Sequence, residues 1–185
     1  MDIFNNLQYN SVLILSYFFI SLIALILNTL TSGKTNQLLF SSYRSSPFNP
    51  LTYVRFFTHA IGHTGWHHFS SNFLTMLLIG PMIEEKYGTM NLLIMMLITA
   101  GITGIINTII SRKAILGASG NVFMLIILSS MVNLEVGKIP LTLVLIFFFY
   151  IANEIIEGIF VKDNVSHMGH LIGAICGVVF GFYWI

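Results

Sequence analysis

The chain has 185 residues, of which 56% are hydrophobic and 8% are Asp, Glu, Lys or Arg. Soluble domains carry about 25% charged residues, so this composition requires that apolar surface faces lipid, and it excludes disordered chains, collagen-like chains and ordinary cytosolic enzymes. A net charge of +1 without a basic run argues against a nucleic-acid partner. The single cysteine, Cys176, excludes an internal disulfide and a CxxC motif.

Six apolar segments predict membrane helices, since about 20 apolar residues cross ~30 Å of hydrocarbon. In chain order they are residues 12–30, 67–83, 90–110, 114–132, 139–156 and 165–185. The first follows an acidic Asp2 and is longer than the ~7–15 apolar residues of a signal peptide, so we expect it to remain in the mature chain. The prediction is a single all-α, polytopic membrane domain over residues 1–185.

A long segment, residues 32–66, separates the first two predicted helices. Its two prolines, serines and aromatic residues predict a loop that dips into the membrane interface, and loops of this length tend to be functional. Two basic residues, Lys86 and Lys138, are expected on the side opposite this loop. Six are expected on its own side, namely Lys34, Arg44, Arg55, Arg112, Lys113 and Lys162. The positive-inside rule alone would therefore place the loop in the cytoplasm.

The fourth and sixth segments together carry a candidate nucleophile and base. Gly117-Ala118-Ser119-Gly120 sets a hydroxyl among small residues, which either expose Ser119 or simply let helices pack closely. In the sixth segment glycines recur every four residues, at Gly169, Gly173, Gly177 and Gly181, and His170 lies on roughly the same arc. We expect this seam to pack on the fourth segment and to bring His170 to Ser119 as its general base.

No acid has an obvious place beside His170. The nearest in sequence, Asp163 and Glu157, lie in or before the preceding loop. The residues therefore predict a Ser-His dyad without a third member. His167 lies nearer the start of the segment and fits an interfacial histidine better than His170 does.

Two further groups of polar residues occur near the second segment. His68 and Asn72 are four residues apart and share a helix face, where they can donate hydrogen bonds to an oxyanion; alternatively, Asn72 caps a helix or joins two helices. His59, His63 and His67 also repeat every four residues and could form a metal-binding stripe. Because no Cys, clear acidic ligand or HExxH pattern accompanies them, we expect no metal and no cofactor.

These residues resemble the rhomboid intramembrane serine proteases over about residues 52–182. Five motifs carry the resemblance in the family's order: Arg55-Phe56-Phe57-Thr58-His59, His68-x-x-x-Asn72, Gly80-Pro-Met-Ile-Glu84-Glu-Lys-Tyr-Gly88, Gly117-Ala-Ser119-Gly120 and Gly169-His170-x-x-Gly173-x-x-x-Gly177. Each motif is weak by itself, but five in one order are specific. The resemblance implies a six-helix bundle with a long loop between helices one and two.

The resemblance also implies a role for each matched residue. Ser119 would be the nucleophile and His170 the base, because the family's histidine is followed by glycine three and seven residues later, as by Gly173 and Gly177. His68, Asn72 and the backbone N–H of Ser119 would form the oxyanion hole. Supporting residues would include a ring that packs on the histidine and a buried structural acid; with the motif glycines, these are Phe123, Glu84, Gly117, Gly120, Gly173 and Gly177.

The sequence departs from the family pattern in several ways. Val54-Arg55 replaces the usual Trp-Arg of the loop, and no soluble N-terminal domain is expected before the first helix. Six-helix relatives have both termini in the cytoplasm, which conflicts with the count of basic residues. We follow the family topology, because that count is small and falls mostly in an unusual loop.

The resemblance implies a protease that cuts transmembrane proteins within a lipid bilayer. Residues 147–150, three phenylalanines and a tyrosine, suit helix five as a gate for a substrate helix. Two other classes stay open: a pseudoprotease that binds membrane clients without cutting them, and a small transporter with His and Glu as proton carriers. A bacterial plasma membrane is the expected location, and the oligomeric state stays open.

Overall fold

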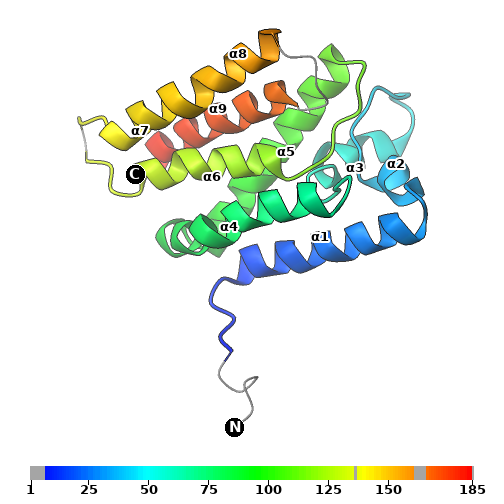
Figure 1. Ribbon diagram of the computed structural model, residues 1–185, viewed down its shortest axis with the longest axis horizontal. Helices are drawn as coiled ribbons and strands as arrows, with labels where there is room; N and C mark the ends of the chain where they lie inside the picture. The colour runs from blue at the N-terminus through cyan, green and yellow to red at the C-terminus, as the bar shows by residue number, and fades with distance from the viewer. Residues whose placement is uncertain (1–6, 136, 161–165, 185) are drawn as a thin grey trace.

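The computed structural model of the chain describes residues 7–135, 137–160 and 166–184. Throughout these ranges the regular structure is helical, with one isolated antiparallel bridge between Ser42 and Ile115 (Figure 1). The elements are α1 (Val12–Leu30), α2 (Lys34–Leu39), α3 (Pro50–Thr58), α4 (Trp66–Tyr87), α5 (Thr89–Ile110), α6 (Ser119–Met131), α7 (Leu141–Ile146), the π-helix η2 (Phe147–Ile151), α8 (Ala152–Phe160) and α9 (His167–Tyr183).

Each of the six predicted apolar segments contains a helix. Among the described residues, three helical stretches are long and apolar enough to cross a membrane: α1, α5 and the continuous stretch α7–η2–α8. Helices α6 and α9 are apolar but have 13 and 17 residues, and α4 has 22 residues with charges near its end. The apolar helical bundle is therefore as predicted, whereas the count of six spans stays a prediction.

Helices α1, α4, α6 and α9 run side by side, with α1 at one outer edge and α7–η2–α8 at the other (Figure 1). The core lies between α4 and α6, where Phe69, Phe73, Met76, Met124 and Leu128 are buried. On the outer stretch α7–η2–α8, the one buried residue among those described is Ile151. This stretch is therefore the most loosely packed of the long apolar helices.

The predicted glycine seam packs α9 against α6. A Cβ on Gly177 would lie 2.7 Å from the carbonyl oxygen of Met124 in α6, and a Cβ on Gly173 would overlap the carbonyl oxygen of Gly120. Backbones can approach this closely only where side chains are absent. The prediction that the glycines of the sixth segment pack on the fourth is confirmed.

Two predicted boundaries differ from the structure. Residues 32–66 are not a simple loop, because they contain α2 and α3; the Asn49 side chain caps α3 by accepting from the Leu51 N–H at 3.0 Å, and Pro50 provides a favourable first turn. The fourth helix begins at Ser119 rather than near residue 114. Gly117 has φ +124°, a conformation that interrupts a right-handed helix.

Candidate active site

A cavity of about 700 Å³ collects the side chains that the sequence predicts as nucleophile, base and oxyanion-hole donors. Ser119 from α6, His170 from α9, and His68 and Asn72 from α4 all line it. Phe123, one turn after Ser119, lines it as well. Three helices far apart in the sequence therefore present a hydroxyl, two imidazoles and an amide to one space.

Ser119 stands at the first turn of α6, directly after a sharp change in backbone direction. The Gly117 N–H donates to the carbonyl oxygen of His59 at 2.9 Å, which fixes this turn against the end of α3. A Cβ on Gly117 would lie 2.6 Å from Nε2 of His68. The glycine thus lets the His68 ring approach the backbone two residues before Ser119.

The His170 ring is held on one face by an aromatic ring. Phe123 stacks on it with ring centroids 4.3 Å apart and an angle of 8° between the planes. The stacked ring that the family resemblance implies is therefore present, and Phe supplies the surface without a hydroxyl.

Asn72 is oriented by a buried histidine outside the cavity. His63 places Nδ1 3.1 Å from the carbonyl oxygen of Ile61 and Nε2 3.2 Å from Nδ2 of Asn72. Since a carbonyl can only accept, Nδ1 of His63 carries the proton and Nε2 accepts from the Asn72 amide. The amide has a second N–H on the same nitrogen, so Asn72 can donate to His63 and to a ligand of the cavity at once.

His63 must be neutral for this arrangement. It lies in the connection between α3 and α4, and its burial lowers its pKa from 6.5 to about 4, with the charge of His68 acting in the same direction. His68 in turn places Nδ1 3.2 Å from the hydroxyl of Thr64. If that hydroxyl donates, Nε2 of His68 carries a proton and can serve as a donor in the cavity.

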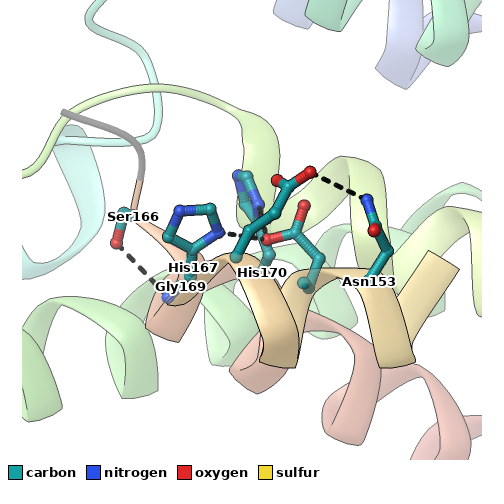
Figure 2. A network of polar contacts seen from close by, with 7 residues as sticks. Asn153, Ser166, His167, Gly169 and His170 are labelled. Atoms are coloured by element: carbon teal, nitrogen blue, oxygen red, sulfur yellow. Dashed lines mark hydrogen bonds and ion pairs between the residues drawn. The ribbon is translucent and has the colours of Figure 1, made fainter. Parts of the chain in front are cut away.

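The expectation that no acid lies near His170 is wrong. Oε2 of Glu154 in α8 lies 2.8 Å from Nδ1 of His170 and also 2.8 Å from Nδ1 of His167. Figure 2 shows His167 and His170 close together at the start of α9, facing carboxylates of the neighbouring helix. Glu157, the nearer acid in sequence, accepts instead from Asn153 at 2.9 Å, and Asp163 lies outside the described residues.

Sequence reasoning missed Glu154 because sixteen positions separate it from His170, a spacing that one helix cannot bridge. The sequence nevertheless contained a signal, which is the presence of an acid in an apolar segment. An acid within an apolar membrane segment is costly and marks a functional site by default.

The ligand-type atoms of Glu154, His167 and His170 all lie within 4.8 Å of one another, which is close enough for a cation to share. The alternative metal stripe from the sequence does not form one helix face. His59 follows α3, His63 lies between α3 and α4, and His67 belongs to α4.

Glu84 lies away from this cavity and is 7% exposed. Its carboxylate accepts from the Ser11 hydroxyl, from the Leu13 N–H at 3.0 Å and from the Thr89 hydroxyl at 2.8 Å. It therefore accepts hydrogen bonds from N–H groups at the start of α1 that have no partner within the helix. This geometry fits the supporting role that the resemblance implies.

Arg55 fixes the segment before α3. Its guanidinium donates to the Tyr43 hydroxyl at 2.9 Å and to the Ser45 hydroxyl at 2.8 Å, and it lies 4.3 Å from the centre of the Tyr43 ring. The Val54 that replaces the family's tryptophan is exposed.

Comparisons with known proteins identify the family of the chain. The Rhomboid domain model matches residues 50–185. The chain is 28% identical over 142 residues to Rhomboid-like protein 11, chloroplastic, of Arabidopsis thaliana, a match that covers 69% of this chain and 51% of that protein. It is 25% identical over 131 residues to Rhomboid protease GlpG of Haemophilus influenzae, which covers 69% of this chain and 68% of that protein.

The match spans about half the length of the plant relative and two thirds of the bacterial one. The family match covers α3 to α9, and with them all the elements that line the cavity. The chain is an integral membrane protein that belongs to the rhomboid family.

Proposed function

We propose that this protein is an intramembrane serine protease that hydrolyses peptide bonds in or near the membrane-spanning segments of other proteins. The observation that carries the proposal is the convergence of Ser119, His170, His68 and Asn72 on one cavity between apolar helices. A relative that shares 25% identity is named a protease, which supports the same reaction class.

The reaction is an acyl transfer. Ser119 Oγ attacks the peptide carbonyl carbon while His170 takes the hydroxyl proton, and the carbonyl oxygen becomes an oxyanion. His68, the Asn72 amide and the Ser119 N–H are the donors for that oxyanion, and losing one such donor lowers kcat by about 10²–10³-fold. His170 then protonates the leaving amine, and water repeats the sequence to release the acyl group from Ser119.

The cavity provides a polar environment inside an apolar bundle. Thr64, Ser71 and Thr75 join the reacting residues on its walls, so water has hydrogen-bond partners next to Ser119. Hydrolysis needs that water, and lipid alone would not supply it.

Substrate entry is proposed along α7–η2–α8. Beneath this stretch lies a second, apolar cavity of about 580 Å³, with Leu143, Phe147 and Ile151 on one side and Ile127 and Ala174 on the other. Tyr150 on the same stretch lines the polar cavity and lies 5.3 Å from Phe123 between ring centres. A transmembrane substrate that displaces this stretch would reach Ser119 from lipid.

The two other classes make different predictions. A pseudoprotease would bind clients without cleaving them, and the presence of all four reacting residues favours an enzyme. A proton-coupled transporter would need a polar path across the membrane, whereas the residues that line the cavity under α7–η2–α8 are all Ile, Leu, Val, Phe or Ala.

The test is cleavage of a model transmembrane substrate in proteoliposomes. Ser119→Ala and His170→Ala are expected to abolish cleavage, whereas His167→Ala is expected to retain it. Cleavage by the Ser119→Ala protein would disprove the proposed nucleophile. Loss of activity in His167→Ala with activity kept in His170→Ala would reverse the assignment of the base.

A further inference from the structure

Glu154 has an unusual position for a carboxylate. It belongs to α8, whose neighbouring residues Ile155, Ile156 and Ile159 are exposed as lipid-facing residues would be. Its own side chain is 13% exposed and turns toward α9. An acid in an apolar helix is costly unless it is paired, so its partners indicate why it is there.

Both partners are histidines, and both approach the same oxygen through Nδ1 at 2.8 Å. A carboxylate accepts hydrogen bonds, so each Nδ1 carries a proton. In neutral imidazole that leaves the lone pair on Nε2. For His170 this is the tautomer that a general base needs, and Phe123 stacked on the ring fixes its plane.

We propose that Glu154 is a positioning residue for His170, so that the reacting set is Ser119, His170 and Glu154. This inference rests on the proposed function. When Ser119 attacks, its proton moves to Nε2 of His170, Nδ1–H stays hydrogen-bonded to Glu154, and the carboxylate remains ionised. The negative charge then stabilises the imidazolium until the proton passes to the leaving amine.

The placement of Glu154 also links catalysis to the outer helices. Glu154 lies three residues after the π-helix η2, on the stretch through which we propose that the substrate enters. While the hydrogen bonds to His167 and His170 hold, the α8 end is fastened to α9. The α7 end has no buried residue, and the Thr142 hydroxyl joins it to α6 by an uncharged hydrogen bond to the carbonyl oxygen of Ser130 at 3.1 Å. Entry at that end breaks this contact and leaves the base in place.

Several ionisable groups surround His170 and must be considered in any pH measurement. His167 and Glu154 contact it or share its partner, and His68 and Tyr150 face the same cavity from α4 and η2. The test therefore compares variants that differ at one of these groups.

The experiment measures kcat and KM against pH for the whole protein in proteoliposomes. Glu154→Gln keeps the shape of the side chain and removes the charge. It is expected to lower kcat by about 10–10³-fold with little change in KM, and to move the acid-side midpoint of the kcat curve to lower pH. Glu154→Asp, which keeps the charge, is expected to recover part of the loss. The matched control is Glu157→Gln on the same helix, which should match the parent protein.

A serine-directed fluorophosphonate separates this proposal from a folding defect. Glu154→Gln should still label at Ser119, but more slowly. Parent-like kcat and pH dependence in Glu154→Gln, with cleavage still dependent on Ser119, would overturn the positioning role alone. Absence of Ser119-dependent cleavage in the parent would instead overturn the proposed function and this inference with it.

One more measurement is needed, because the carboxylate of Glu154 and the ring nitrogens of His167 and His170 are close enough to share a cation. The parent protein dialysed against EDTA is expected to keep its activity. Loss of activity that Zn²⁺ restores would show that Glu154 acts as a metal ligand and would overturn the positioning role.

Discussion

At the scale of single residues, the buried His63 makes both the stability of the protein and the orientation of Asn72 depend on pH. Its pKa is about 4 in the folded protein because burial disfavours the charged form, whereas an unfolded chain has a value near ~6.5. The unfolded state therefore binds more protons between these values, so stability is complete above pH ~6.5 and falls as pH decreases toward about 4. Protonation would also remove the acceptor that orients Asn72.

The measurable consequence is a loss of about 1–3 kcal/mol of unfolding free energy through this window. Unfolding in detergent micelles should show a flatter pH dependence for His63→Gln, which does not titrate, than for the parent. His59, whose pKa burial also lowers to about 4, contributes a similar slope and stays unchanged in this comparison. Equal slopes for parent and variant would contradict the account.

Also at this scale, motifs and spacing in the sequence pointed to residues that lie around one cavity. Ser119, His170, His68 and Asn72 were singled out by motif and spacing, and all four line one cavity. Glu154 was missed because its contact crosses from α8 to α9, and no local pattern reports a pairing between helices. The orientation of Asn72 by His63 was missed for the same reason.

At the scale of elements, the seam between α6 and α9 brings the proposed nucleophile and base together. Gly173→Ala would force a methyl group against the Gly120 backbone, next to Ser119. We expect a destabilisation of about 1–3 kcal/mol and a loss of cleavage from displacement of α9. Gly65→Ala is the control, since a Cβ there meets no atom within 4 Å. A fully active, stable Gly173→Ala protein would show that the helices are not held this closely.

The outer stretch should not move as one rigid rod. Its α8 end is joined to α9 through Glu154, and a π-helix separates it from α7; π-helical segments commonly mark functional irregularities. Hydrogen exchange in micelles should therefore be faster in Leu141–Ile146 than in Ala152–Phe160. Equal rates, or faster exchange in α8, would contradict an entry at the α7 end.

Element boundaries show where a sequence pattern is insufficient. The apolar run of α1 matched its observed ends, because flanking polar residues stop it on both sides. The start of the fourth helix could not be predicted from hydropathy, since Gly117 prevents the helix from extending further toward the N-terminus through its backbone conformation and not through its polarity. The short helices α2 and α3 were not predicted, because the prolines and serines of their segment are also typical of a loop.

At the scale of the whole molecule, the six-span topology makes a simple prediction. An even number of crossings places both ends of the chain on the same side of the membrane. Cysteine tags added near each end, in a Cys176→Ser background, should both react with a membrane-impermeant maleimide from one side of sealed vesicles. The buried Cys176 gives little background even when retained. Tags that react from opposite sides would require an odd number of spans.

The composition predicted a membrane protein and an all-helical bundle, and the structure and family agree. Composition could not decide how many helices cross, because α6 and α9 are short and α4 carries polar residues for its reactive face and its charged end. The count of basic residues on the side of the long loop included Arg55, which is buried and hydrogen-bonded to Tyr43 and Ser45.

The most direct test of a Ser119–His170 reacting pair is to map the covalent adduct of a fluorophosphonate by mass spectrometry. We expect a single modified residue, Ser119, in the parent protein, and no adduct in Ser119→Ala or His170→Ala. An adduct at another residue, or undiminished labelling of Ser119 in His170→Ala, would contradict it.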